Sequence, residues 1–146
     1  MQKRIGIWIM WMCGVFGILN AQTVDHSLTI HKVDEKELFD RLIDFSLHHD
    51  YFVHTVNSLD KFMQISYTQE KPKKIFSAET DKVITYNIFV RSLGEKVWSI
   101  RVQARVSELI WNGEVHKSSY YYKDLGVSQD VKIYKQLMAA LTAYFD

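Results

Sequence analysis

Hydrophobic and polar residues alternate most regularly in the stretch from 97 to 111. Its apolar side carries Trp98, Ile100, Val102, Ala104 and Val106, and its polar side carries Ser99, Arg101, Gln103, Arg105 and Ser107. A period of two residues is the pattern of a β-strand that packs one face against a core. The stretch 82–93 has the same period. Shorter candidate strands lie at 26–33, 51–56, 61–68 and 114–124.

Turn-forming residues separate these candidate strands. Residues 57–60 (NSLD) and Gly94-Glu95 join neighbouring strands, and Asn112-Gly113 is a strong signal for a two-residue hairpin turn because both residues tolerate positive φ. A turn at Asn112-Gly113 sets residues whose numbers sum to 225 opposite one another. Three cross-strand pairs follow from it: Arg105 with Tyr120, Gln103 with Tyr122, and Glu108 with Lys117.

Two segments change to the helical period. In the segment from about 35 to 49, Leu38, Leu42 and Phe45 share one face, and Asp34 with Glu37 has the form of a capping box. The second helix is expected to start near Ser128 as its N-cap, with Asp130 in its first turn. Its apolar face carries Val131, Tyr134, Met138, Leu141 and Phe145.

The predicted order is therefore β-α-β-β-β-β-β-α. Antiparallel strands with one apolar face and two amphipathic helices predict an α+β two-layer sandwich. We expect a sheet of about five to six strands whose helices both cover the face that bears Trp98, Ile100 and Val102. The stretch 68–82 contains Pro72, the single proline, and is expected to be an exposed loop with a short strand at Ile75-Phe76.

The N-terminal segment has the three parts of a secretory signal peptide. Lys3 and Arg4 precede an apolar run from Ile5 to Leu19, and Ala21 is the expected cleavage point. The run of about 15 residues is shorter than the roughly 20 that span a bilayer. We therefore expect a signal peptide at 1–21, a single domain at 22–146 and export to the periplasm or the extracellular space. An uncleaved N-terminal anchor is the alternative.

Composition after cleavage argues against several classes of protein. Cys13 is the single cysteine and follows the bulky Trp11 and Met12 in mid-run, which disfavours a lipoprotein. Its removal leaves no disulfide. Cleavage also leaves 16 basic residues against 17 acidic ones, and this near-neutral balance argues against nucleic-acid binding. No GxSxG elbow or glycine-rich phosphate loop is present, so the sequence indicates no catalytic residue and no cofactor.

A family resemblance rests on four stretches. The run LTIHKVDEKELFDRLIDF, followed by KFMQISYT, VITYNIFVRS and VWSIRVQARVSEL, resembles a family of uncharacterised secreted bacterial domains with a TATA-binding-protein-like fold. The likeness lies in a short strand, a helix with an acidic cap, and antiparallel strands after it. The basic, aromatic stretch that the family has after its fourth strand finds only a loose counterpart in VWSIRV. The resemblance implies the fold and export. It implies no site residue and no DNA binding.

Half of the six histidines lie in the stretch HHDYFVH at residues 48–54. A metal site needs side chains that converge. His48 and His49 are adjacent on the helix and diverge by about 100°, while His54 belongs to the next strand. We interpret the stretch as a helix–strand boundary, with His49 near the apolar helix face and His48 toward solvent. A metal-dependent or other hydrolase that uses His49 and His54 is the alternative.

The polar face of the predicted sheet is the candidate binding surface. Arg91, Arg101, Arg105, Tyr120 and Tyr122 are expected there, with Phe89 beside them. Arginine beside tyrosine is typical of recognition surfaces, although such pairs also simply stabilise a solvated sheet. The sequence therefore predicts a non-catalytic binding or assembly module that meets an envelope protein or an anionic envelope component. A structural subunit of an envelope complex is a further alternative.

Overall fold

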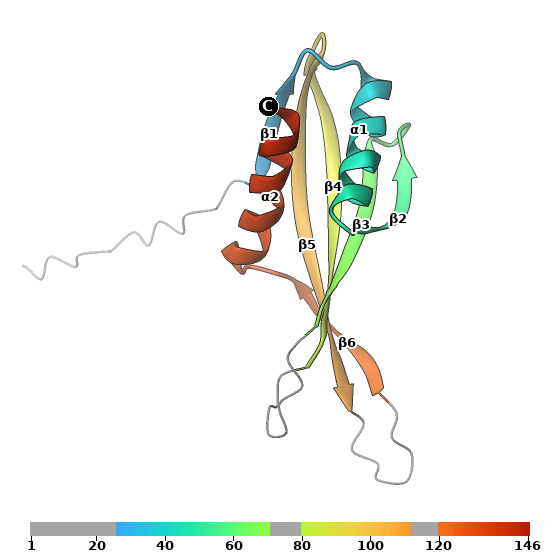
Figure 1. The fold of residues 1–146 in the computed structure, drawn as a ribbon, viewed down its shortest axis with the longest axis vertical. Coiled ribbons are helices and arrows are strands. Elements are labelled where there is room, and N and C mark those ends of the chain that lie inside the picture. Colours follow the sequence, from blue (N-terminus) through green and yellow to red (C-terminus); the bar gives the residue numbers. More distant parts are fainter. Residues whose placement is uncertain (1–25, 71–79, 112–119) are drawn as a thin grey trace, which may run out of the picture.

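The structure, a computed structural model, describes residues 26–70, 80–111 and 120–146. Its elements follow the predicted order (Figure 1). They are β1 (Ser27–His31), α1 (Glu35–His48), β2 (Phe52–Asn57), β3 (Phe62–Gln69), β4 (Lys82–Gly94), β5 (Val97–Trp111), β6 (Tyr120–Val127) and α2 (Val131–Phe145). The predicted signal peptide, Cys13, the Ile75-Phe76 strand and the Asn112-Gly113 turn lie outside the described residues.

One antiparallel sheet contains all six of these strands. Its order is β1-β5-β4-β3-β2, and β6 also pairs with β5. The first part of β5, Val97–Arg101, pairs with β1, and the part from Arg105 to Trp111 pairs with β6. The long strand β5 therefore pairs with both β1 and β6 along one of its edges.

The gap between β1 and β6 on that edge is closed by hydrogen bonds. The Val102 amide donates to the His26 carbonyl at 3.0 Å, and the Ser128 amide donates to the Ala104 carbonyl at 2.8 Å. The Tyr134 hydroxyl of α2 accepts from the Ala104 amide at 3.1 Å and donates to the Ser128 carbonyl at 2.8 Å. A buried amide without a partner is costly. The Tyr134 hydroxyl supplies a partner to the Ala104 amide at the point where the pairing of β5 with β1 ends and its pairing with β6 begins.

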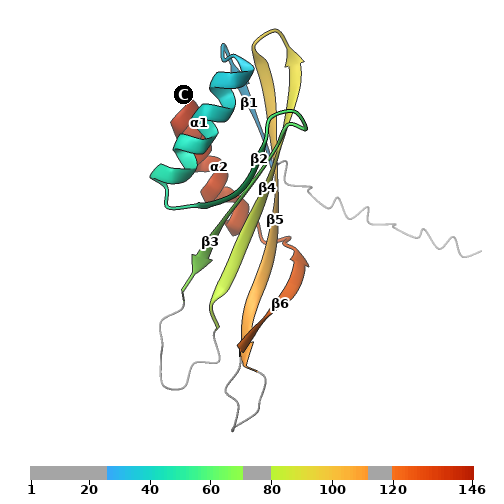
Figure 2. The same cartoon turned by 90° about the vertical axis from the view of Figure 1, so that its right-hand side faces the viewer.

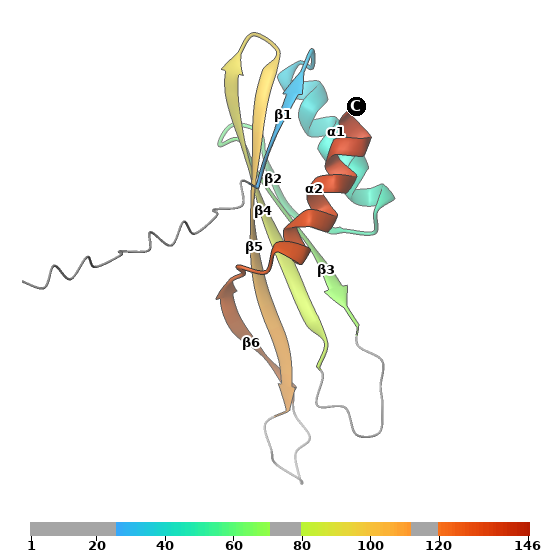
Figure 3. The same cartoon turned by 90° about the vertical axis from the view of Figure 1, so that its left-hand side faces the viewer.

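Both helices cover one face of the sheet, as the sequence predicts (Figures 2 and 3). Alternate residues of β4 and β5 point toward them, including Tyr86, Ile88, Ile100, Val102 and Ala104, which are all buried. The helices contribute Leu38, Phe39, Leu42, Phe45, Tyr134, Leu137 and Leu141 to the same core. The other side, which we call the outer face, is covered by neither of the two described helices.

Both helix starts differ in detail from the prediction. Asp34 is the N-cap of α1, but its side chain makes no cap hydrogen bond, and its carboxylate lies 3.2 Å from Lys96 Nζ instead. The N-cap of α2 is Asp130 rather than Ser128. The Asp130 carboxylate accepts from the Lys132 amide at 2.9 Å, while the Ser128 hydroxyl accepts from the Asp130 amide at 3.1 Å. Two candidates for a cap lay two residues apart, and the hydroxyl of the first binds the backbone amide of the residue that caps the helix.

The predicted register of β5 with β6 is wrong. Tyr122 lies opposite Leu109 rather than Gln103, and Arg105 lies opposite Val127 rather than Tyr120. The prediction assumed that pairing continues into a two-residue turn, whereas the described pairing begins at Trp111 and Tyr120. Leu125 is the extra residue of a β-bulge that shifts the register once more.

The shift also removes the predicted pair of Glu108 with Lys117. Glu108 lies opposite Lys123, and its carboxylate accepts from the Thr80 hydroxyl at 2.7 Å. The Lys82 ammonium lies 3.9 Å from the same carboxylate oxygen. The Glu108 carboxylate is therefore balanced by Lys82 of β4 and hydrogen-bonded by Thr80, which precedes that strand.

The sheet is longer than the helix layer. The part made by residues 107–111 and 120–127, which we call the distal ribbon, extends past the ends of both helices (Figure 1). Its residues are largely exposed on both sides. Neither helix in the described part of the chain is long and apolar enough to span a membrane.

Candidate functional site

The outer face carries all five residues that the sequence predicts for binding. Along β5, Arg101, Gln103 and Arg105 are exposed between buried neighbours. On β4, Phe89 lies opposite Arg101 and Arg91 lies opposite Ser99. Register alternation places Tyr120 and Tyr122 of β6 on the same face as Arg105. An even shift of the pairing moves side chains along a sheet without changing their face, so this part of the prediction holds despite the wrong register.

The five residues do not form one patch. From Arg101 to Trp111, the partner of Tyr120, is ten steps along β5, which corresponds to about 33 Å. Tyr122, opposite Leu109, is also remote from Arg101. The predicted surface therefore separates into an arginine part near the β4–β5 end and an aromatic part on the distal ribbon, with Arg105 between them.

The arginine part surrounds a hollow of about 480 Å³, which we call the arginine hollow. It is lined by Ser27, Phe89, Arg91, Leu93, Ser99 and Arg101. Three adjacent strands thus contribute to it: β1, β5 and β4. The Phe89 ring is 44% exposed and packs against the Phe62 ring at 5.4 Å between centroids, so one wall is apolar and held in place by its neighbour.

The charges in this hollow are not neutralised by the described residues. Within residues 26–70, 80–111 and 120–146, neither Arg91 nor Arg101 forms an ion pair or a side-chain hydrogen bond. They occupy diagonal positions on neighbouring strands, which are about 7–8 Å apart. Two long arginine side chains that start from such positions repel each other weakly, and both can reach one anion between them.

Arg105 is different because it has a partner. Its guanidinium forms a two-pronged ion pair with Asp124 of β6, in which Nε donates to Oδ1 at 3.0 Å. The Gly126 amide donates to the same carboxylate at 2.9 Å. The Arg105 hydrogen bonds, with the Gly126 amide, lower the pKa of Asp124 to about 2. Arg105 therefore fastens β6 to β5, and the prediction that it faces Tyr120 is not met.

The histidines at 48–54 are each held by a local contact. His48 Nδ1 lies 2.8 Å from the Asp44 carbonyl oxygen, and His49 Nδ1 lies 3.0 Å from the Phe45 carbonyl oxygen. The His49 ring packs on the Phe45 ring at 4.3 Å, as the prediction of its face requires, although the residue as a whole is exposed.

His54 is the extra residue at a break in the β2–β3 register. Its Nε2 lies 2.7 Å from the Ser66 hydroxyl oxygen, and its ring contacts the Phe52 ring at 4.8 Å. No group of three or more His, Cys, Asp or Glu residues in the described ranges is arranged to hold a metal ion.

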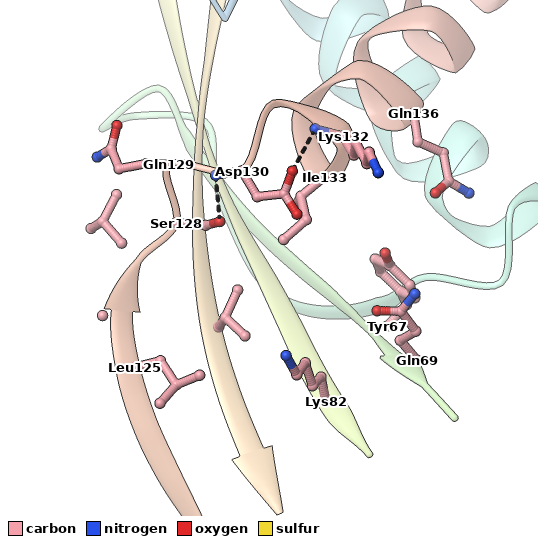
Figure 4. Close-up of a pocket in the computed structure, with 13 residues that line it drawn as sticks. Tyr67, Gln69, Lys82, Leu125, Ser128, Gln129, Asp130, Lys132, Ile133 and Gln136 are labelled. Atoms are coloured by element: carbon pink, nitrogen blue, oxygen red, sulfur yellow. Dashed lines mark hydrogen bonds between the residues drawn. The ribbon is translucent and has the colours of Figure 1, made fainter. Parts of the chain in front are cut away.

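A second cavity, of about 510 Å³, lies on the helix side where α2 begins (Figure 4). Tyr67, Gln69 and Lys82 line it from the strands, and Lys132, Ile133 and Gln136 line it from α2. The chain from Leu125 to Asp130 forms another wall. The sequence analysis did not predict this cavity. The signal in the sequence was the glycine at 126. In the structure it lies within β6, has φ +79° and follows the bulge at Leu125, so the strand is irregular just before the chain runs into α2.

Three tyrosines lie beside this cavity in one cluster. The Tyr51, Tyr67 and Tyr86 rings contact one another at 5.7–6.1 Å. The Tyr86 hydroxyl donates to the Ile133 carbonyl at 2.9 Å and ties the sheet to α2. Burial raises the pKa of all three phenols, so they stay neutral at physiological pH. Tyr86 serves as a hydrogen-bond donor and all three rings serve as packing groups, and a role as bases is not supported.

Comparison with known proteins identified no relative, so the site is interpreted from its geometry. No family model and no curated protein matches the sequence, so the resemblance to secreted domains with a TATA-binding-protein-like fold stays a prediction.

Proposed function

We propose that this chain is an exported, non-catalytic binding module of the periplasm or the cell envelope. In this proposal, it captures an anionic group of an envelope protein or another envelope component in the arginine hollow. The observation that carries the proposal is the pair Arg91 and Arg101, which line one hollow without a described carboxylate partner. An anion between the two guanidinium groups would relieve their repulsion and accept several charge-assisted hydrogen bonds.

The residues around the two arginines narrow the chemical class of ligand that fits the hollow. Phe89 and Leu93 provide apolar surface at the edge of the charged groups, and Ser27 and Ser99 provide hydroxyls. A carboxylate or phosphate that is attached to an apolar or aromatic group fits this combination better than a free inorganic ion. The backbone below the hollow supports recognition, since β4 and β5 are paired without a break from Lys82–Glu108 to Ser92–Trp98 and the register shifts only at Leu93.

A titration with phenyl phosphate tests the proposal directly. We expect the amide resonances of residues 89, 91, 99 and 101 to shift in a two-dimensional NMR spectrum of the wild type. Arg91→Gln/Arg101→Gln should weaken binding at least about tenfold, because it removes both charges. The melting temperature should change little, because the replaced side chains are exposed and unpaired.

Arg105→Gln is the matched control. It removes one positive charge from the same face and the same strand, but from outside the hollow. Binding of phenyl phosphate by this variant should stay near the wild-type value. Equal binding by the double variant, or equal binding of neutral benzyl alcohol, would show that the hollow does not select anions.

A photo-crosslinking residue at position 89 extends the test to natural ligands. The protein carrying it is exposed to envelope extracts and illuminated, with and without Arg91→Gln/Arg101→Gln. We expect one or a few anionic species to be attached only when both arginines are present. A protein recovered in fixed stoichiometry from both versions would indicate a structural subunit instead.

A further inference from the structure

We propose that strand β6 is a self-pairing edge, at which two copies of this chain join their sheets. Among the described strands, β6 pairs only with β5, so its other edge is open. Its residues are almost all exposed, including Tyr120 at 62%, Tyr121 at 52% and Tyr122 at 57%. An open, aromatic edge strand is a template for another strand, and natural proteins usually block such edges.

The regular part of the edge ends at Asp124. The bulge at Leu125 and the positive φ of Gly126 interrupt the strand there, and Tyr120–Asp124 is the regular segment within the described residues. A two-fold axis beside Tyr122 would pair this segment with itself in an antiparallel arrangement.

The side chains are complementary in that register. Tyr122 meets Tyr122 of the second copy on the outer face. On the same face, each Tyr120 meets the Asp124 carboxylate of the other copy, which has room for one more hydrogen bond beside those from Arg105 and Gly126. On the helix-side face, each Tyr121 meets Lys123 of the other copy, which suits a cation–π contact.

Neighbouring registers are worse. Moving the axis to Lys123 would set two ammonium groups opposite each other, and moving it to Asp124 would oppose two carboxylates. Like charges directly opposite one another destabilise a sheet. An axis at Tyr121 opposes no like charges among the described residues, but it gives up the contacts of Tyr120 with Asp124 and of Tyr121 with Lys123. The axis at Tyr122 is therefore the most complementary of these arrangements. With five described positions paired on each side, the contact is small, and we expect a dissociation constant on the order of micromolar.

Self-pairing has a consequence for ligand binding, and this consequence rests on the proposed function. A two-fold axis normal to the sheet leaves both outer faces on the same side of the joined sheet. Two arginine hollows would then face one ligand-bearing surface, and binding of the second would be assisted by the first.

Cysteine cross-linking tests the pairing without reference to any ligand. Cys13, the single cysteine of the chain, is replaced by serine, and Tyr122→Cys is added. Directly opposed strand residues lie within disulfide range, so a covalent dimer should form on mild oxidation. Thr55→Cys on the exposed edge strand β2 is the matched control and should remain monomeric. Absent cross-linking at 122, or equal cross-linking at 55, would overturn the proposal.

Charge substitutions at Tyr121 supply a second test that reports the register. Tyr121→Lys places an ammonium group opposite Lys123 of the other copy at two symmetric positions, and should weaken dimerisation about tenfold or more in sedimentation experiments. Tyr121→Glu removes the same ring but provides an ion-pair partner, and should dimerise at least as tightly as the wild type at low salt. An equal effect of both substitutions, or a wild type that is monomeric at every concentration, would exclude this register.

Discussion

The two halves of β5, Val97–Val106 and Ser107–Trp111, differ in their strand neighbours and in what covers them. The first half pairs with β4 throughout and with β1 at its start, whereas the second pairs with β6 and its pairing with β4 ends at Glu108. From Val97 to Val106, even-numbered residues from Trp98 onward are buried under the helices and most odd-numbered ones are exposed. From Ser107 to Trp111, no residue is buried, because the strand has passed the end of the helix layer. The difference shows that the alternation of buried and exposed residues along a strand depends on whether helices pack on one of its faces. Beyond the helix layer, aromatic and aliphatic side chains remain exposed, and packing against the core does not explain why they are apolar.

The largest effect should come from a pair of identical substitutions in the two halves. Ile100→Ala removes a fully buried side chain from the core and should lower the free energy of unfolding by about 2–5 kcal/mol. Ile110→Ala, on the same strand and the same side of the sheet, should cost less than about 1 kcal/mol, because Ile110 is only partly buried. Urea unfolding followed by circular dichroism measures both. Equal losses would mean that the distal ribbon is packed as tightly as the core.

A smaller effect is expected where the two halves meet. Tyr134→Phe removes the hydroxyl that accepts from the Ala104 amide and leaves that buried donor without its partner. We expect a loss of about 1–3 kcal/mol in the free energy of unfolding. Tyr121→Phe removes an exposed hydroxyl of the distal ribbon and serves as the control, with a change within about 0.5 kcal/mol. A neutral Tyr134→Phe would indicate that water or a backbone shift satisfies the amide.

The sequence predicts the covered part of this fold better than the ribbon. Trp98, Ile100 and Val102 alternate with polar residues, and helical periodicity at 35–49 and in the C-terminal segment shows what packs on them. Burial of one face leaves a single favourable register there. Along the distal ribbon, both faces are exposed, so nothing in the hydrophobic pattern distinguishes the predicted pair of Gln103 with Tyr122 from the observed pair of Leu109 with Tyr122.

The candidate site follows the same division. Phe89, Arg91 and Arg101 were predicted to share the polar face of the sheet, and the well-specified β4–β5 register brings them together there. The Arg105–Tyr120 pair depended on the weakly specified β5–β6 register and is not formed. The cavity beside α2 depends on where a strand ends, how Gly126 turns the chain and which residue caps the helix. These are local choices between near-equal alternatives, such as Ser128 and Asp130, and single-sequence patterns do not decide them.

The smallest expected effect concerns the ion pair that fastens β6 to β5. Because Arg105 lowers the pKa of Asp124 to about 2, from an ordinary value of 3.8, the folded state favours the charged carboxylate. The stabilisation from this pair is therefore fully present above the ordinary pKa and is lost as the pH falls from about 4 to about 2. Both groups are exposed, so the effect on global unfolding should be slight. Carboxyl-carbon NMR titration measures the pKa itself. In Arg105→Gln, the Asp124 pKa should rise toward 3.8 but stop short of it, because the Gly126 amide still donates to the carboxylate. Titration of wild-type Asp124 near 3.8 would mean that β6 is held by its backbone pairing alone.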